Sequence, residues 1–311
     1  MSIVYGKASG CPPPMHYNIG MPELPEVETV RRGLDELLVN RAIDDVITSY
    51  DKSFPNSPAD VNRFLIGSKV TAVKRRAKVL MIELDTNYTL LIHLKMTGQL
   101  VYRADSGERF GAGHPNDSLI GKLPDRSTRV SLQLNNAQLF FNDQRRFGWM
   151  RLLPTVEIPN LDFFKKVGPE PLAADFTKTN FQERLMKRPN TTIKAALLDQ
   201  TVIAGVGNIY ADESLWGAKI HPATRVKDVS VVKLGRLYES LRAVLQLSID
   251  KGGSSDRNYV DATGKKGSYL AFANVFRREG QSCPRCGHEI IKLRVAGRGT
   301  HICPNEQRVK A

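Results

Sequence analysis

CPRCGHEIIKLRVAGRGTHICPNE, residues 283–306, contains three cysteines in two short pairs, and the last position of the second pair is a glutamate. Two residues separate Cys283 from Cys286, sixteen residues follow, and two residues separate Cys303 from Glu306. Two close ligand pairs joined by a hairpin-length spacer are typical of a zinc ribbon, because each pair spans one side of a tetrahedral ion. The spacing therefore predicts a β-hairpin ribbon that holds one structural zinc ion through these four side chains.

The glutamate is the unusual member of this ligand set. Zinc accepts carboxylate oxygen, but structural sites are usually built from cysteine and histidine. We therefore expect Glu306 to weaken zinc binding relative to a fourth thiolate. Three cysteines without any metal would leave the spacing unexplained.

The composition describes a globular chain with an excess of positive charge. The 311 residues suffice for two domains, and 41% hydrophobic and 25% charged residues are ordinary values for a folded protein. The formal net charge of +13 favours a polyanionic partner, nucleic acid before an anionic membrane. No apolar run approaches the roughly 18 residues that span a bilayer. Cys11 is the one cysteine outside the ribbon, so no disulfide framework is expected, which fits a reducing cytoplasm.

The period of the apolar residues changes along the chain. Pro25 suits a first helical turn, and apolar residues then recur at steps of three and four from Val27 to Leu38, which predicts a helix of about four turns. Over residues 70–150 the period shortens toward two, with turn-forming residues between the apolar runs. Residues 21–150 are therefore expected to form a mainly antiparallel β-sandwich or barrel with one leading helix.

The second half is predicted to be helical after a linker at residues 151–171. Helical periodicity returns within residues 172–275, and AGVGN at 204–208 separates two of the helices. Its glycines suit a tight turn, and Asn208 is a good N-cap for a helix whose N-terminus can face a phosphate. The Gly-, Ser- and Lys-rich residues 252–268 form a loop too long to be a simple connection.

Residues 1–20 fit neither half. They lack the sustained apolar core of a signal peptide and the Arg-rich helical face of a transit peptide. Three consecutive prolines at 12–14 disfavour both helix and strand. We interpret this segment as a disordered extension or as sequence that precedes the natural start at Met21.

Six motifs occur in an order that resembles one enzyme family. They are MPELPEVET at 21–29, RRAK at 75–78, HLKMTG at 93–98, RRFG at 145–148, GVGNIY at 205–210 and the terminal ribbon. Together they resemble the bacterial formamidopyrimidine-DNA glycosylases over residues 21–308. The related endonuclease VIII group usually has glycine at the position of Leu24, so its resemblance ranks second.

The resemblance implies an α+β fold with an N-terminal β-sandwich and leading helix, a helix-two-turn-helix domain, and a zinc-ribbon β-hairpin at residues 276–308. It implies a bifunctional DNA glycosylase/AP lyase of base excision repair that excises oxidised purines such as 8-oxoguanine and formamidopyrimidines. The strand would be nicked by β,δ-elimination. The expected partner is double-stranded DNA with oxidised bases or abasic sites, and neither a diffusible cofactor nor a membrane is expected. The resemblance also implies a monomer in the bacterial cytoplasm that is associated with the nucleoid through its binding to DNA.

The implied catalytic residues are consistent with the chemistry. Pro22, once Met21 is removed, would attack C1′ of the damaged nucleotide. An α-amino group titrates near about 8, so part of it is neutral at pH 7, and a secondary amine can form an iminium with the opened sugar. Glu23 would be the general acid and base, although alone it would be read as a carboxylate at a helix N-terminus. Lys78, otherwise a solvated strand lysine, would contact phosphate or the damaged base, and Arg298 would bind phosphate.

Other residues of the resemblance would hold the DNA open. A base must leave the duplex before its sugar can be attacked, and a side chain must fill the gap. Met96, Arg145 and Phe147 match the family's wedge, with the guanidinium donating to the unpaired cytosine; read alone, Met96 and Phe147 would be core residues. Asn208 would bind a phosphate. Tyr269 would lie near the extruded base, behind the Gly-rich loop that is expected to read the lesion.

Two features leave other functions open. In a chain that begins at residue 1, the nitrogen of Pro22 is part of an amide and cannot form an iminium, unless translation starts at Met21 or a protease removes the extension. Together with Glu306, this keeps a catalytically silent protein that binds lesions as an alternative. An endonuclease VIII-like glycosylase for oxidised pyrimidines is a second alternative. A zinc-ribbon RNA-associated factor would leave Pro22 and Glu23 unexplained.

Overall fold

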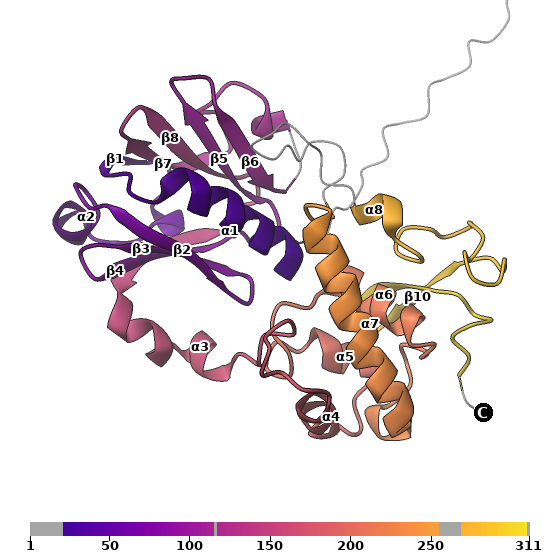
Figure 1. The fold of residues 1–311 in the computed structure, drawn as a ribbon. Coiled ribbons are helices and arrows are strands. Elements are labelled where there is room, and N and C mark those ends of the chain that lie inside the picture. Colours follow the sequence, from indigo (N-terminus) through magenta and orange to yellow (C-terminus); the bar gives the residue numbers. More distant parts are fainter. Residues whose placement is uncertain (1–20, 115–116, 255–268, 310–311) are drawn as a thin grey trace, which may run out of the picture.

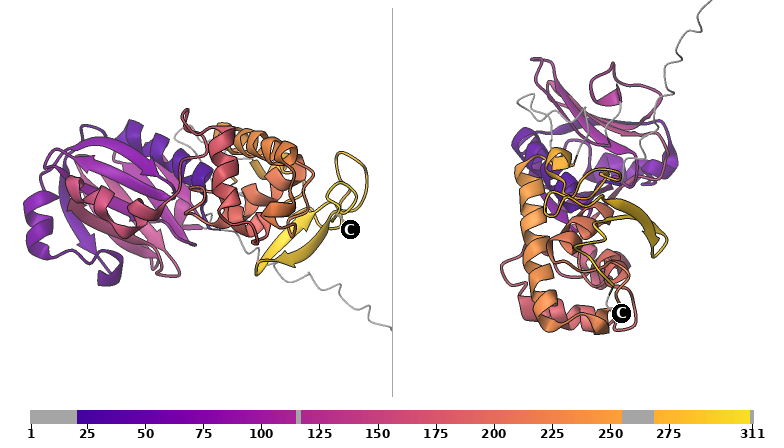
Figure 2. Two further views of the ribbon diagram at one scale, coloured as in Figure 1. Left: turned by 90° about the horizontal axis from the view of Figure 1, so that it is seen from below. Right: turned by 90° about the vertical axis from the view of Figure 1, so that its right-hand side faces the viewer.

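The computed structural model describes residues 21–114, 117–254 and 269–309. The expected extension at residues 1–20 and most of the predicted loop at 252–268 lie outside the described residues. The described chain folds into a β-sandwich, a helical unit and a ribbon, each with a hydrophobic cluster of its own. Figure 2 shows the three in succession along the molecule.

Helix α1 (Leu24–Leu38) confirms the predicted leading helix. A capping box starts it: the side chain of Glu23 caps the N-terminal turn, and Oε2 of Glu26 accepts a hydrogen bond from the N–H of Glu23 at 2.9 Å. Pro25 occupies the first turn, where its missing N–H costs nothing. The face that follows is buried in the sandwich.

Two antiparallel sheets form the sandwich, as the alternating pattern predicts. The five-stranded sheet has the order β1 (Ile43–Thr48), β7 (Thr128–Leu134), β8 (Ala137–Asp143), β5 (Gly98–Ala104) and β6 (Arg109–Gly113). The four-stranded sheet has the order β2 (Val70–Arg76), β3 (Val79–Leu84), β4 (Tyr88–His93) and β9 (Trp149–Pro154). Every strand pair in both sheets is antiparallel. The predicted turns are present, with Asn87 and Asn136 at positive φ.

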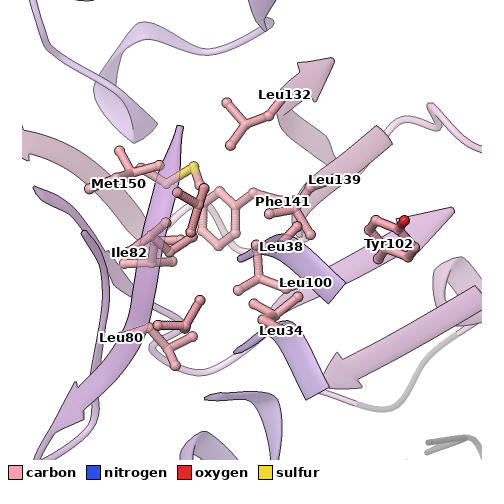
Figure 3. Close-up of a cluster of buried hydrophobic side chains, with 14 of the residues drawn as sticks. Leu34, Leu38, Leu80, Ile82, Leu100, Tyr102, Leu132, Leu139, Phe141 and Met150 are labelled. Carbon is pink, nitrogen blue, oxygen red and sulfur yellow. The ribbon is translucent and has the colours of Figure 1, made fainter. Parts of the chain in front are cut away.

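Helix α1 packs against the edge strands β2 and β6 and so lies along one side of the sandwich (Figure 1). Its side chains also satisfy the exposed backbone of β2: Oδ1 of Asp35 accepts from the N–H of Val73 at 2.9 Å, and Nη1 of Arg31 donates to the carbonyl of Val73 at 3.4 Å. Figure 3 shows Leu34 and Leu38 of α1 pointing into the core between the two sheets. Each such fully buried leucine contributes about 2 kcal/mol from lost apolar surface.

Short elements connect these parts. Outside the sheets lie η1 (Asp51–Ser53), α2 (Pro58–Phe64), η2 (Asp117–Leu119), η3 (Thr155–Asn160), α3 (Asp162–Lys166) and η4 (Val226–Asp228). The segment 151–171, expected to be a linker, therefore contains the end of β9 together with η3 and α3. Apolar side chains of this segment pack against the outer face of the four-stranded sheet, which explains why the segment is folded.

The helical unit contains the predicted helices. They are α4 (Lys178–Met186), α5 (Ile193–Leu198), α6 (Asn208–Gly217), α7 (Val231–Asp250) and α8 (Tyr269–Phe272). One detail of the prediction is wrong: Gly207, not Asn208, is the N-cap of α6, and Asn208 is the first helical residue. The side chain of Asn208 is therefore available for another contact, described below. Among the described residues, no helix is long and apolar enough to cross a membrane.

The ribbon is a two-stranded antiparallel hairpin of β10 (Ile291–Val295) and β11 (Arg298–Ile302). Val295 pairs with Arg298, so Ala296 and Gly297 form a two-residue turn with φ values of 50° and 73°. A small cluster that includes Trp216 packs the ribbon against α6. The predicted hairpin, with Arg298 next to its tip, is confirmed.

Candidate active site and DNA interface

Glu23 lies where the sandwich meets the helical unit. Its side chain is 3% exposed, and Oε1 accepts a hydrogen bond from the N–H of Ile209 in α6 at 3.2 Å. Burial raises the pKa of Glu23 to about 7; the charge of Lys78 opposes this shift, and the charge of Glu26 adds to it. A carboxyl group that titrates near neutral pH can both donate and accept a proton there. The residue before it, Pro22, is also buried.

The turn before α6 brings the helical unit onto this carboxyl group. The N–H of Leu24 donates to the carbonyl of Gly205 at 3.0 Å, and Gly205 has a φ of +77°. A β-carbon on Gly207 would lie 2.2 Å from Cδ of Glu23, which is closer than two non-bonded carbon atoms can approach. Glycine at this position therefore lets the backbone N-terminus of α6 reach the carboxyl group.

Lys78 joins the same cluster from the sandwich. It lies in the turn between β2 and β3, directly after Ala77, whose φ is 53°. The lysine is only 6% exposed, and burial lowers its pKa, while the charges of Glu23 and Glu26 raise it. The structure thus places a buried ammonium group within electrostatic reach of the carboxyl group of Glu23.

The ribbon hairpin is attached to the first turn of α6. The carbonyl of Gly299 accepts hydrogen bonds from Nδ2 of Asn208 at 3.0 Å and from Nζ of Lys194 at 3.2 Å. Lys194 and Asp212, both fully buried, form an ion pair of 2.5 Å beneath this contact. Arg298 remains exposed at the tip, and its charge acts on Lys78. Two cationic or polar side chains expected to bind phosphate, Asn208 and Arg298, are therefore neighbours.

The three wedge residues meet at two loop tips of the sandwich. Nη1 of Arg145 lies 3.2 Å from Sδ of Met96, and the guanidinium lies 4.9 Å from the ring centre of Phe147. Phe147 is 53% exposed, so it is not a core residue. Buried Asp143 fixes the loop that carries them by accepting from the N–H of Gly148 at 2.6 Å and from that of Arg145 at 3.2 Å.

The cysteines of the ribbon are arranged as a metal site. The sulfur atoms of Cys283, Cys286 and Cys303 all lie within 4.8 Å of one another, and those of Cys286 and Cys303 are 3.4 Å apart. Three sulfurs bound to one tetrahedral zinc are about 3.8 Å apart, because each Zn–S bond is about 2.3 Å. The three side chains therefore fit a zinc ion, which would supply a structural cross-link between the two halves of the ribbon.

Family models match all three parts of the chain. The formamidopyrimidine-DNA glycosylase N-terminal domain matches residues 21–150, the formamidopyrimidine-DNA glycosylase H2TH domain matches residues 167–259, and a zinc finger found in FPG and IleRS matches residues 280–305. The chain belongs to the formamidopyrimidine-DNA glycosylase family.

Similar proteins match more than nine-tenths of this chain. The formamidopyrimidine-DNA glycosylase of Pelotomaculum thermopropionicum is 41% identical over 293 residues, which cover 93% of this chain and all of that protein. That of Chloroflexus aurantiacus is 42% identical over 289 residues, 92% of this chain and 98% of that protein. The crystal structure of Lactococcus lactis Fpg (MutM) with DNA containing N7-benzyl-Fapy-dG has a TM-score of 0.81 at 35% identity, covering 93% of this chain and 100% of that one.

Several residues that orient the site were missed from the sequence. One is Glu170. Its Oε1 accepts from the N–H of Ala77 at 2.6 Å and from Arg76 at 2.9 Å, and its Oε2 accepts from Arg75 at 2.8 Å. Burial alone would raise the pKa of Glu170, but Arg75 and the other two donors hold it below its ordinary value. Glu170 thereby fixes the turn that carries Lys78. The sequence does not reveal this contact, because Glu170 and Ala77 are 93 positions apart along the chain.

Glu26 organises the other side of the catalytic cluster. Besides accepting from the N–H of Glu23, it accepts hydrogen bonds from the hydroxyl of Tyr210 and, at 2.7 Å, from the N–H of Ser254. The ring of Tyr269 packs 5.5 Å from that of Tyr210 and is buried. Tyr269 is therefore close to the site, and its expected contact with an extruded base stays a prediction. The spacing of Glu23 and Glu26, a capping-box signature, was the available signal for Glu26.

The structure places Glu306 in a different kind of contact from the predicted one. Its Oε2 lies 2.8 Å from Nζ of Lys219 and 3.0 Å from Nη1 of Arg285. These hydrogen bonds, that of Lys219 first, lower the pKa of Glu306. The carboxylate is thus engaged with two cations, whereas the mutually close ligand atoms of the ribbon are the three sulfurs.

Proposed function

We propose that this chain is a bifunctional DNA glycosylase/AP lyase that excises oxidised purines and nicks the DNA strand, with Pro22 as the nucleophile. The observation that carries the proposal is the buried carboxyl group of Glu23, with a pKa of about 7, directly after Pro22. Membership of the family supports the glycosylase activity. Structures of relatives contain DNA with a Fapy-dG derivative or carbocyclic 8-oxo-G, which favours oxidised purines as the substrates here.

The first stage is base release. The neutral secondary amine of Pro22 attacks C1′, the bond from C1′ to the damaged base breaks, and the base leaves with the bonding electrons and takes up a proton. Glu23, protonated near neutral pH, donates a proton to the ring oxygen as the C1′–O4′ bond opens. The product is an iminium between Pro22 and the opened sugar.

Strand cleavage follows from the iminium, which accepts electrons. Removal of a C2′ proton expels the 3′ phosphate by β-elimination, and a second proton removal expels the 5′ phosphate by δ-elimination. We assign the acceptance of these protons, one after the other, to Glu23, which is ionised after the first stage and buried directly after Pro22. Water then hydrolyses the remaining imine and frees Pro22.

The cationic and polar side chains around the cluster suit the binding of the DNA backbone. Lys78 is buried beside Glu23, and Asn208 and Arg298 lie together at the contact of α6 with the hairpin. We assign Lys78 to the lesion or its phosphate and the other two to flanking phosphates. The net charge of +13 supports duplex DNA as the partner, and with it a place on the nucleoid in the cytoplasm.

The wedge supports action on a base extruded from a duplex. Met96, Arg145 and Phe147 form one group at two loop tips, in which Arg145 and Phe147 are exposed and Met96 is partly buried. Insertion of the apolar side chains would fill the vacated space, and the guanidinium would donate to the partner base.

Borohydride trapping tests the proposal. The reductant converts an iminium into a stable amine, so protein that begins at Pro22 should become cross-linked to DNA with 8-oxoguanine or an abasic site. Protein that begins at residue 1 should not, because its Pro22 nitrogen is an amide. Glu23→Gln should lose base excision and retain DNA binding, with Glu36→Gln on the exposed face of α1 as the control. Efficient trapping of the uncleaved long chain would contradict Pro22 as the nucleophile, and binding without trapping of the short chain would favour a silent lesion-binding protein.

A further inference from the structure

We propose that Glu306 fastens the ribbon to the helical unit, and that the fourth coordination position of the zinc is left to an exchangeable small ligand. That ligand is water, replaceable by a low-molecular-weight thiol. The proposal concerns the metal site and stands or falls independently of the reaction at Pro22.

The first step is the engagement of the carboxylate. Glu306 has a side-chain exposure of 11%, and its Oε2 lies within 3.0 Å of nitrogen atoms of both Lys219 and Arg285. Lys219 follows the C-cap of α6, Ala218, and belongs to the helical unit, whereas Arg285 lies in the first cysteine pair of the ribbon. The carboxylate therefore bridges the two parts of the molecule, and it is not among the mutually close ligand atoms of the ribbon.

The second step is the support of Arg285. Its guanidinium lies 3.8 Å from the ring centre of Trp216 in α6, and its Nη1 donates to the carbonyl of Trp216 at 3.2 Å. Trp216 belongs to the cluster that contains the ribbon cysteines. Glu306, Arg285 and Trp216 thus form a continuous connection from the end of the ribbon to α6.

The third step is the backbone around Glu306, which is fixed on both sides. The N–H of Cys303 donates to Oε1 of Gln307 at 3.1 Å, and the N–H of Gln307 donates to the carbonyl of Cys303 at 2.9 Å. Nε2 of the buried Gln307 donates to the carbonyl of Ile220 at 2.9 Å. The turn from Cys303 to Gln307 is thereby held in shape by hydrogen bonds, and it docks on the helical unit with Glu306 directed to the two cations.

The fourth step concerns the net charge of the zinc site and the access of solvent to the three sulfurs. Three thiolates and one Zn²⁺ carry a net charge of −1, and a carboxylate ligand would increase this to −2 while giving up two ion pairs. A neutral water molecule avoids both costs, and catalytic zinc sites show that zinc with three protein ligands can take water in its fourth position. Cys286 is only partly buried, so solvent can approach this side of the three sulfurs. A small thiol, as a softer ligand, can then replace the water.

Cobalt substitution tests the open position. Co²⁺ occupies tetrahedral zinc sites, and its visible bands report the ligands. Added 2-mercaptoethanol should shift these bands saturably in the unchanged protein and leave them unchanged in Glu306→Cys, which supplies a fourth thiolate. Glu306→Gln should bind zinc within about threefold of the unchanged protein in a competition with a chromophoric chelator. A loss of more than about tenfold in zinc affinity for Glu306→Gln, or unshifted cobalt bands in the unchanged protein, would overturn the open position.

Hydrogen exchange in the metal-free protein tests the anchor. Lys219→Met should accelerate exchange of the ribbon amides about fivefold, the size expected for one partly buried ion pair, and Glu306→Gln at least as much, because it also loses the ion pair with Arg285. The double variant should exchange no faster than Glu306→Gln alone, because Glu306→Gln already removes the ion pair with Lys219. Arg294→Gln, an exposed change on β10, should leave exchange unaltered. Unaltered exchange in both single variants, or strictly additive effects, would refute the anchor.

Discussion

Gly207 and Glu23 approach each other so closely that a β-carbon on the glycine would lie 2.2 Å from Cδ of the glutamate. The contact joins the first turn of α6 to the residue that follows Pro22. The packing of the helical unit against the sandwich therefore sets the environment of the carboxyl group. Burial, to which this contact contributes, is the main reason that the pKa of Glu23 is raised to about 7.

Gly207→Ala should therefore separate α6 from Glu23. We expect loss of base excision of at least about tenfold and destabilisation of about 1–3 kcal/mol, the usual cost of overpacking. Excision kinetics and denaturant unfolding would measure the two effects. Gly235→Ala in the second turn of α7 is the matched control: its added carbon meets a flexible lysine chain, and alanine in a helix should be neutral or stabilising by up to about 1 kcal/mol. Full activity of Gly207→Ala would show that the close contact is not needed.

Stability should depend on pH through Glu23. Its pKa is raised from the ordinary value of 4.5 to about 7 in the folded chain, so the folded chain holds a proton that the unfolded chain releases between these values. This contribution to stability is complete below about pH 4.5 and is lost as the pH rises through 7. Glu23→Gln should then be stabilised relative to the unchanged protein by about 2 kcal/mol at pH 8 and little changed at pH 5. Thermal unfolding at both pH values, with Glu36→Gln as the control, would measure this; equal effects at both pH values would contradict the raised pKa.

Glu170 should show the opposite dependence. Arg75 and the other donors hold its pKa below the ordinary value, so its contribution to stability is present above about pH 4.5 and is lost as the pH falls through the folded pKa. Glu170→Gln should destabilise by about 1–3 kcal/mol at pH 7, and the difference from the unchanged protein should shrink in acid. Glu170→Gln should also reduce DNA cleavage, because the turn that carries Lys78 loses the carboxylate that fixes it. Denaturant unfolding across this pH range and single-turnover cleavage are the measurements; a difference in stability that is constant with pH would contradict the ion-pair account.

The parts of the fold that depend on local pattern were predictable, and those that depend on contacts between distant segments were not. The period of three and four after Pro25 predicted α1, and the cysteine spacing predicted the ribbon. The cap of α6 was wrong because Gly207 had to be the residue in contact with Glu23, which sequence alone does not reveal. The ion pair of Glu306 with Lys219 likewise arises only when the ribbon docks on α6.

Alanine substitutions of two phenylalanines, one in the wedge and one in the core of the sandwich, should have different effects. Phe147 is 53% exposed and Phe141 is fully buried. Phe147→Ala should lower turnover of duplex DNA about tenfold or more, spare single-stranded substrate, and cost less than about 1 kcal/mol of stability. Phe141→Ala should cost about 3–5 kcal/mol. A loss of stability in Phe147→Ala as large as that of the buried residue would support a packing role instead.

Removal of zinc should reveal how the ribbon is held. With three thiolates as protein ligands, the unchanged protein should lose zinc to a chelator faster than Glu306→Cys. DNA affinity should then fall about tenfold, because the hairpin that carries Arg298 loses its metal cross-link and one or two phosphate contacts. Glu306→Gln should fall further on metal loss, since its ribbon lacks both the metal and the anchor to Lys219. Zinc content and DNA binding before and after chelation, at one salt concentration, would decide the order. Equal DNA affinity of all three proteins without metal would mean that the buried pair of Lys194 and Asp212 alone keeps the hairpin on α6.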